Sequence, residues 1–346
     1  MKFFLDLTSF LLDSLRVRIC PKPHISALAF LSLFTSLLQA VETDPVGYVS
    51  NEVQAGGEAI ISPSLTRPAV FTGNISAIDN ADTITVSGSP GWITNEYATN
   101  YYVLVADGNR EGMWAVISAN GADSLDLTFV TENLGATLGD RVEVGDAVKI
   151  IPFWTLATLL PDADVPDQSQ VLLFDRAEAG INRSALATYT SFDGYGWYNG
   201  PTEGNNQIIY PDESLVFRTP AGSSYTFVNA GTVPMSSFRT VLSSVSPGVA
   251  QDIRMTSGLP TSVTLQELFD DGASAEGDQI LIFDNDEAGI NKSALFTATY
   301  FDGYGWYDGP TERNAYALNP GQGFIYRKSS GNASDLAVSF KPSYQQ

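Results

Sequence analysis

The chain has 346 residues, of which 44% are hydrophobic, with 30 Gly and 18 Pro. This composition is typical of a globular protein rather than of a disordered or collagen-like chain. The 39 acidic residues outnumber the 18 basic ones and give a formal net charge of −21. Such an acidic surface repels nucleic acid and anionic lipid headgroups, so we expect neither as a partner.

Residues 1–40 are typical of a secretory signal peptide. A basic patch over 16–22 precedes an apolar, uncharged run over 25–38, and 38–40 is an acceptable cleavage tripeptide. The apolar run is too short for a comfortable transmembrane span, and no later run approaches one. A second apolar cluster lies ahead of the basic patch, which suggests that translation starts downstream, near Val17.

Cleavage after Ala40 would remove Cys20 and His24, which are the only cysteine and the only histidine of the chain. The mature protein would then have no Ser-His-Asp or Cys-His catalysis, no Cys/His metal site and no disulfide. Its core alone would hold the fold in the periplasm, at the cell envelope or outside the cell.

Residues 41–152 predict an N-terminal β domain. Short apolar or alternating runs recur, with turn signals about every 8–12 residues, as in a small barrel or sandwich. Asp107-Gly108-Asn109 is typical of a hairpin turn. The predicted strands are VGYVS, EAIIS, AVFTG, DTITVSG, YYVLVA, MWAVIS, SLDLTFV and AVKIIPF.

The rest of the chain contains one module twice. Residues 171–203 and 280–312 align without a gap and are identical at most positions, and the register continues on both sides. This pattern indicates a duplication. We therefore divide the mature chain into the N-terminal domain, a first β module over 153–245 and a second over 246–346.

Within each module the pattern predicts an antiparallel meander with one short helix. Leucines at helical spacing come first, then a buried strand, VLLF or ILIF. The loop D-x-x-E-A-G-I-N follows, and Asp193-Gly194 (Asp302-Gly303 in the second copy) marks a tight turn before the aromatic run YGWY. The fold class expected for the mature chain is all-β.

The ordered motifs resemble a family of exported bacterial proteins that often occur as paralogues and have no assigned activity. The resemblance covers nearly all of the mature chain and implies export and this domain order, but no catalytic residues. It rests on PVGYVS, REGMWAVISAN, IIPFWTLATLL and the twice-occurring FD-x-x-EAGIN-x-SA.

The repeated loop is a candidate calcium site. Its acidic and amide side chains are hard oxygen ligands beside a glycine turn, but a late acidic ligand of the EF-hand kind is missing. The alternative is a connecting loop whose Asp and Asn bond to the backbone. The candidate ligands are Asp175, Glu178 and Asn182 in the first copy and Asp284, Asp286 and Asn291 in the second.

The aromatic run is a candidate ligand-binding surface. Tyr195 and Trp197, like Tyr304 and Trp306, have a spacing of two and would share one face of a strand, where exposed rings could stack on a sugar. The alternative is that the rings belong to the core, as most large aromatics do.

The carboxylates Asp193 and Glu203, repeated at Asp302 and Glu312, leave an Asp/Glu-dependent carbohydrate-active hydrolase as a third reading. Two nearly identical sites suit binding or architecture better than one active cleft. We therefore expect an exported, non-enzymatic protein with a structural or adhesive role and an unknown macromolecule or polysaccharide as partner. A carbohydrate-binding protein is the alternative.

Overall fold

The structure is a computed structural model that describes residues 44–129, 138, 141–242, 244–269, 272, 274–333 and 335–345. The expected signal peptide, with Cys20 and His24, lies outside these residues. The described chain confirms the all-β prediction, since strands predominate and the α-helices are two single turns.

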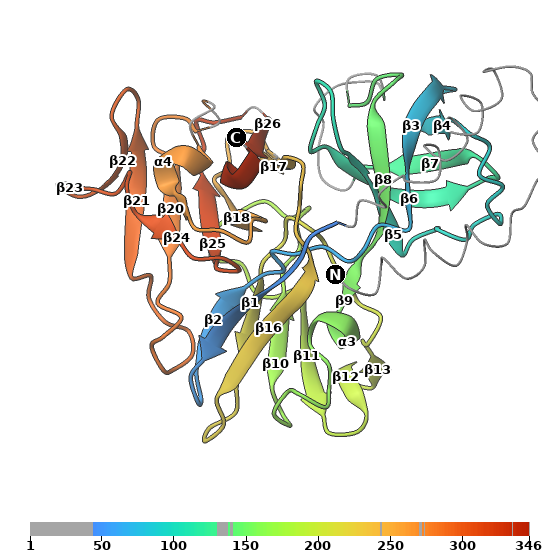
Figure 1. The fold of residues 1–346 in the computed structure, drawn as a ribbon. Helices are drawn as coiled ribbons and strands as arrows, with labels where there is room; N and C mark the ends of the chain where they lie inside the picture. Colours follow the sequence, from blue (N-terminus) through green and yellow to red (C-terminus); the bar gives the residue numbers. More distant parts are fainter. Residues whose placement is uncertain are drawn as a thin grey trace, which may run out of the picture. The chain divides into compact units, whose positions relative to one another are not determined.

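A closed six-stranded barrel forms the greater part of the N-terminal region (Figure 1). Its interior is filled by apolar side chains that alternate along the strands, and Ile84, Ile117 and Val148 are completely buried. The strand order around the barrel is β3 (Phe71–Ile78), β4 (Thr83–Val86), β7 (Ser124–Thr128), β6 (Trp114–Asn120), β5 (Tyr101–Val105) and β8 (Ala147–Pro152).

Each repeat is built on a six-stranded antiparallel sheet, and the two sheets have the same order of equivalent strands. The first is β13 (Thr202–Glu203), β12 (Gly196–Asn199), β11 (Ala187–Phe192), β10 (Gln170–Leu173), β15 (Leu215–Arg218) and β2 (Glu58–Ile61). The second is β23 (Thr311–Glu312), β22 (Gly305–Asp308), β21 (Phe296–Phe301), β20 (Gln279–Ile282), β25 (Gly323–Lys328) and β18 (Gln251–Thr256).

Smaller two-stranded sheets accompany each six-stranded sheet and are also duplicated. In the first repeat these are β1 (Val46–Val53) with β16 (Tyr225–Thr232), and β9 (Trp154–Thr155) with β14 (Ile208–Ile209). In the second they are β17 (Phe238–Leu242) with β26 (Leu336–Phe340), and β19 (Val263–Thr264) with β24 (Ala317–Leu318). A 3-10 turn, η3 (Ser343–Gln345), follows the last strand.

The strand pairing divides the chain differently from the boundaries expected at 152 and 245. Strands β1 and β2 complete the sheets of the first repeat, and β17 and β18 complete those of the second. The barrel is therefore an insertion between β2 and β9, where the second repeat has only the short link 257–262. Pairing over such distances follows from long-range hydrogen bonding, which local sequence patterns do not reveal.

The predicted short helices are confirmed as α3 (Leu156–Leu159) and α4 (Leu265–Leu268). Each begins with a capping box, in which the side chain of Thr155 or Thr264 accepts a hydrogen bond from the third helical residue. The leucines at helical spacing are buried. Each helix thus contributes its leucines to the core of its repeat.

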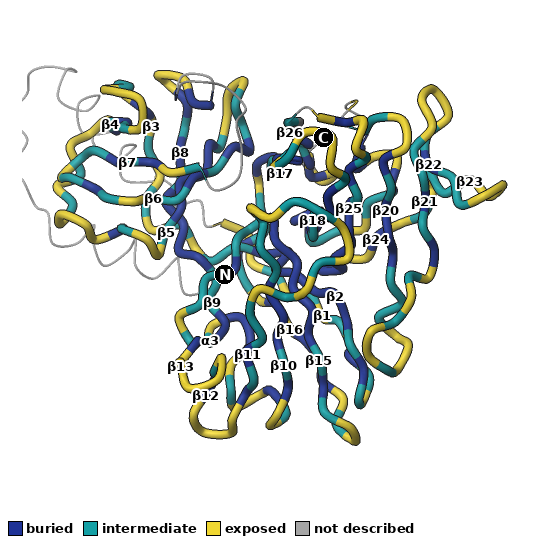
Figure 2. Tube along the Cα trace, turned by 180° about the vertical axis from the view of Figure 1, so that it is seen from behind, coloured by how far each residue is buried: buried dark blue, intermediate teal, exposed yellow. Residues whose placement is uncertain are grey.

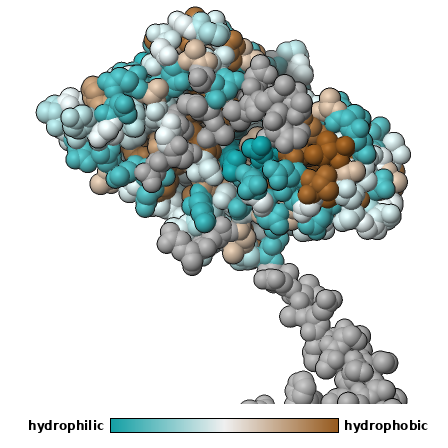
Figure 3. All heavy atoms as spheres, turned by 90° about the horizontal axis from the view of Figure 1, so that it is seen from above, coloured by the Kyte–Doolittle hydropathy of each residue, from teal (hydrophilic) through white to brown (hydrophobic). Residues whose placement is uncertain are grey.

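Three large cores stabilise the fold, one in the barrel and one in each repeat (Figure 2). The core of the second repeat also includes barrel residues, among them Tyr102 and Ile151. A fourth, smaller cluster joins the two repeats: Ile60, Leu172, Val216, Leu281 and Ile325 are its buried members. On the outside, hydrophilic and neutral residues cover much of the face in Figure 3, with one compact apolar patch.

Candidate functional site

The repeated loop of each module packs against an edge strand of the other module. The loop over 284–292, from the second repeat, lies against β2 of the first, and Glu58 N donates to Gly289 O at 3.0 Å. In the same way the loop over 175–183 lies against β18, where Asp252 N donates to Gly180 O at 3.0 Å. Each repeat therefore places its most characteristic segment on the edge strand of the other.

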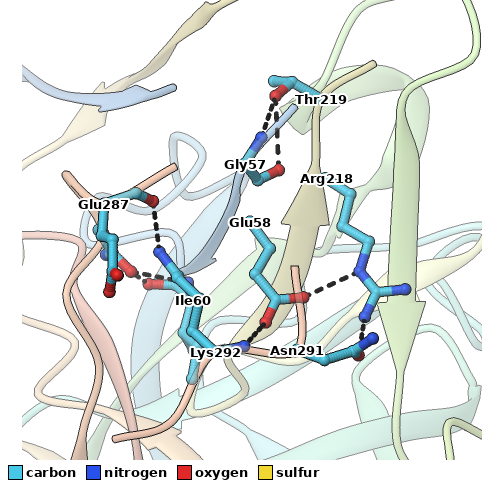
Figure 4. A network of polar contacts seen from close by, with 9 residues as sticks. Gly57, Glu58, Ile60, Arg218, Thr219, Glu287, Asn291 and Lys292 are labelled. Carbon is cyan, nitrogen blue, oxygen red and sulfur yellow. Dashed lines mark hydrogen bonds and ion pairs between the residues drawn. The ribbon is translucent and has the colours of Figure 1, made fainter. Parts of the chain in front are cut away.

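An ion pair and an amide fix the first of these contacts (Figure 4). Arg218 lies opposite Glu58 in the register of β15 and β2, and its Nε donates to Glu58 Oε2 at 2.9 Å. Its Nη2 donates to Asn291 Oδ1 at 2.7 Å. The second carboxylate oxygen of Glu58 accepts a hydrogen bond from Lys292 N at 3.1 Å. We call this set of residues the first clamp.

The second clamp is the equivalent set in the other direction. Arg327 Nε donates to Asp252 Oδ1 at 2.7 Å, and its Nη2 donates to Asn182 Oδ1 at 2.9 Å. The backbone N–H of Asn182 donates to Asp252 Oδ2 at 2.7 Å. Charge-assisted bonds of this kind hold geometry well when, as here, both partners are largely shielded from water.

Most of the candidate calcium ligands interact with other groups of the chain. Asn182 and Asn291 have φ angles of 51° and 54°, and their side-chain oxygens accept the clamp arginines. Asp175 Oδ1 accepts from Ala177 N, and Asp284 Oδ1 from Asp286 N, as in Asx turns. Glu178 is largely exposed and lies 3.8 Å from Arg183. No group of three or more His, Cys, Asp or Glu in the described residues is arranged to hold a metal.

The structure separates the tyrosine and the tryptophan of each aromatic run. Tyr195 and Tyr304 are both 74% exposed, whereas Trp197 is 0% and Trp306 1% exposed. Trp197 Nε1 donates to Leu160 O at 2.9 Å, inside the core of its repeat. A buried indole cannot stack on a sugar ring, so these rings stabilise the fold instead.

The reason for this separation is Gly196. With a φ of +89° it begins β12 directly after the turn that contains Tyr195, so Tyr195 does not share a strand face with Trp197. A Cβ at this position would lie 2.2 Å from Asn205 Oδ1, which accepts the hydrogen bond of Trp197 N. Gly305 and Asn314 repeat this arrangement in the second module.

The duplicated glutamates also have structural partners. Glu203 Oε1 accepts from Asn205 Nδ2 at 2.8 Å, and Glu312 Oε1 accepts from Asn314 Nδ2 at 2.9 Å. These glutamates position the asparagines that hold the tryptophan backbone. Their hydrogen bonds provide no support for a hydrolytic pair.

A pocket of about 360 Å³ opens between the two repeats, beside the clamps. Its apolar lining comes from the small cluster that joins the sheets, together with Phe174 and Phe283. Its charged lining is Glu58 and four cations, Arg183, Arg218, Arg254 and Lys292. The spacing of these cations in the sequence gives no signal of a site. They belong to different repeats and come together only because each repeated loop packs against the other repeat.

Next to this pocket lies a buried carboxyl that is not duplicated. Arg176 forms a two-pronged ion pair with Asp212, and Glu213 lies beside it. Burial raises the pKa of Glu213 to about 7, although Arg176 opposes this effect. The equivalent residue of the second repeat is Gln322, which is also buried.

Within the described residues, no helix has the length and apolarity needed to cross a membrane. Comparison of the chain with models of protein families, with curated proteins and with solved structures finds no match.

Proposed function

We propose that the chain is an exported, non-enzymatic protein of the cell envelope or the extracellular space, with a structural or adhesive role. In this proposal the two repeats form a fixed platform, and the inserted barrel contacts another macromolecule. The observation that carries it is the reciprocal pair of clamps. They show that the duplicated loops serve to join one repeat to the other.

Three further features support this proposal. The barrel has no counterpart in the second repeat, so it can provide a binding surface that the two similar modules do not have. The duplicated glutamates, Glu203 and Glu312, accept hydrogen bonds from the asparagine side chains that hold the tryptophan backbone. The extensive cores suit a protein that keeps its shape outside the cell without disulfides.

The proposal is tested with the mature chain, Val41 to Gln346, and with envelopes isolated from the organism that makes it. We expect the protein to sediment with envelopes in a saturable way. Ile93 and Val144 are the two most exposed large apolar side chains among the described residues of the barrel. The double change Ile93→Ser and Val144→Ser should reduce this binding at least about tenfold, because few residues dominate most interfaces.

The matched control changes two equally exposed rings of the repeats, Tyr195→Ser and Tyr304→Ser. It should leave envelope binding unchanged. Loss of binding in this variant alone would favour the carbohydrate-binding alternative. Absence of saturable binding by the unchanged protein, or recovery of an unprocessed chain from the cytoplasm, would overturn the proposal.

A further inference from the structure

The pocket between the repeats concentrates positive charge in an otherwise acidic protein. The chain carries a formal net charge of −21, yet four of its 18 basic residues line this one pocket against a single glutamate. A concave, partly apolar site lined by charge of one sign focuses the field on whatever enters it.

The cations of the pocket differ in how far they are neutralised. Arg218 has a carboxylate partner, Glu58. Within the described residues, Lys292 Nζ donates to the backbone carbonyls of Asp284 and Glu287, the latter at 2.8 Å. The carboxylates near it, Glu58 among them, act on its charge without forming an ion pair with it. Arg183 donates to the carbonyls of Asp175 and Asp252, and its ion pair with exposed Glu178 is loose. Lone carbonyls satisfy donors without cancelling charge.

Arg254 is the least satisfied of the four. Its guanidinium lies over the ring of Phe174, 3.2 Å from the centroid. Nε and Nη1 are shielded from solvent and make no hydrogen bond to the described residues. Burial of the group lowers its pKa to about 10, which is the direction expected of a cation that has lost water without gaining enough partners.

The first repeat builds the equivalent part of the junction without an arginine. The equivalent residue of β2 is Ile60, whose backbone N–H and C=O both pair with the side chain of Asn285. In the other half, the position equivalent to Asn285 is Arg176, which pairs with Asp212 instead. The symmetry of the junction is therefore broken at Arg254, inside the pocket.

We propose that this pocket binds a small organic anion, with an oxyanion head held by Arg254, Arg183 and Lys292 and an apolar body against the aromatic and aliphatic lining. Arginines pair favourably with oxyanions. The volume of about 360 Å³ lies within the range of small-molecule sites, and such sites combine an apolar lining with a few polar groups. This inference is independent of the envelope role proposed above.

The test measures binding of three probes to the whole mature chain by calorimetry. Octanoate has both an oxyanion head and an apolar body, sulfate has the head alone, and octanol has the body alone. We expect saturable octanoate binding below about 10 mM, and binding at least about tenfold weaker for sulfate and for octanol.

Arg254→Ile gives the pocket the residue that the first repeat has at this position. It should weaken octanoate binding at least about tenfold, since each lost charge-assisted contact is worth this much or more. Circular dichroism and the melting temperature show whether the variant is folded, and Arg254→Lys, which keeps the charge, should retain part of the affinity. Lys149→Met, a loss of charge on the barrel, should leave binding unchanged.

Three results would overturn the inference. The first is that octanoate does not bind the unchanged protein below about 10 mM. The second is that sulfate or octanol binds as tightly as octanoate. The third is that the folded variants Arg254→Ile and Arg254→Lys both bind octanoate as tightly as the unchanged protein does.

Discussion

Arg218 and Asn291 belong to different repeats, and the arginine Nη2 donates to the asparagine Oδ1 at 2.7 Å. The same bond recurs between Arg327 and Asn182 at 2.9 Å. Each asparagine has a left-handed backbone conformation that few residues adopt without strain. The repeated loop is thus shaped to present an amide oxygen to the arginine of the neighbouring repeat.

The first prediction concerns Asn291. Asn291→Ala should lower the free energy of unfolding by about 2 kcal/mol, of which about 1 is the lost hydrogen bond and about 1 the strain of alanine at a φ of 54°. Urea unfolding, followed by circular dichroism, measures the change as a shift of the midpoint at constant slope.

Asn291→Gly separates the two contributions, because glycine accepts the backbone conformation but lacks the amide. It should cost only about 1 kcal/mol. If Asn291→Ala and the unchanged protein unfold at the same urea concentration, the first clamp does not stabilise the junction.

The second prediction concerns the aromatic run. Trp197→Ala should destabilise the protein by about 3–5 kcal/mol, because it empties a fully buried site. Tyr195→Ala, two residues away and 74% exposed, should change stability by no more than about 0.5 kcal/mol. Thermal unfolding compares the two variants. Equal effects would contradict the division of this run into a core residue and a surface residue.

Much of the fold follows from local sequence patterns. The apolar runs that form β10 and β20, the leucines of α3 and α4, and the glycine turns all give signals within a few residues. The side-chain faces of the YGWY run do not, because the period of two holds only along an uninterrupted strand. Gly196, with its φ of +89°, interrupts it.

The candidate site could not be predicted in the same way. Glu58 and Arg218 pair in the sheet although the whole inserted barrel lies between them in the sequence, and Asn291 belongs to the other repeat. The loop residues Asp175 and Asn182 therefore look like metal ligands in the sequence, since the arginine that uses the amide oxygen lies far away in the chain. Only the pairing of edge strands brings these groups together.

The third prediction tests the repeated loops as calcium sites. The melting temperature should be the same with calcium and with a chelator, because Asn182 and Asn291 already accept hydrogen bonds from arginines. An ion bound at a hundred times its dissociation constant would stabilise the native state by about 2.7 kcal/mol. A rise of several degrees on adding calcium would contradict the structural role given to these loops.

The fourth prediction concerns Glu213 and pH. Burial raises its pKa from 4.5 to about 7 in the folded protein, so the folded state binds the proton more tightly than the unfolded state does. Its stabilising contribution is complete below pH 4.5 and is lost as the pH rises through 7. The loss amounts to about 3 kcal/mol at most. Urea midpoints measured across this range report it.

Glu213→Gln should remove this pH dependence, because an amide does not ionise. Glu213 Oε2 accepts a hydrogen bond from Tyr210 N, and the equivalent Gln322 accepts one from Asn319 N, so the amide fits the role. The variant should therefore match the unchanged protein near pH 4 and exceed its stability near pH 8. Glu52→Gln, on the exposed face of β1, serves as the control for loss of charge. A variant that is less stable at both pH values would contradict this account, because it would show that the amide cannot replace the carboxyl group beside Arg176.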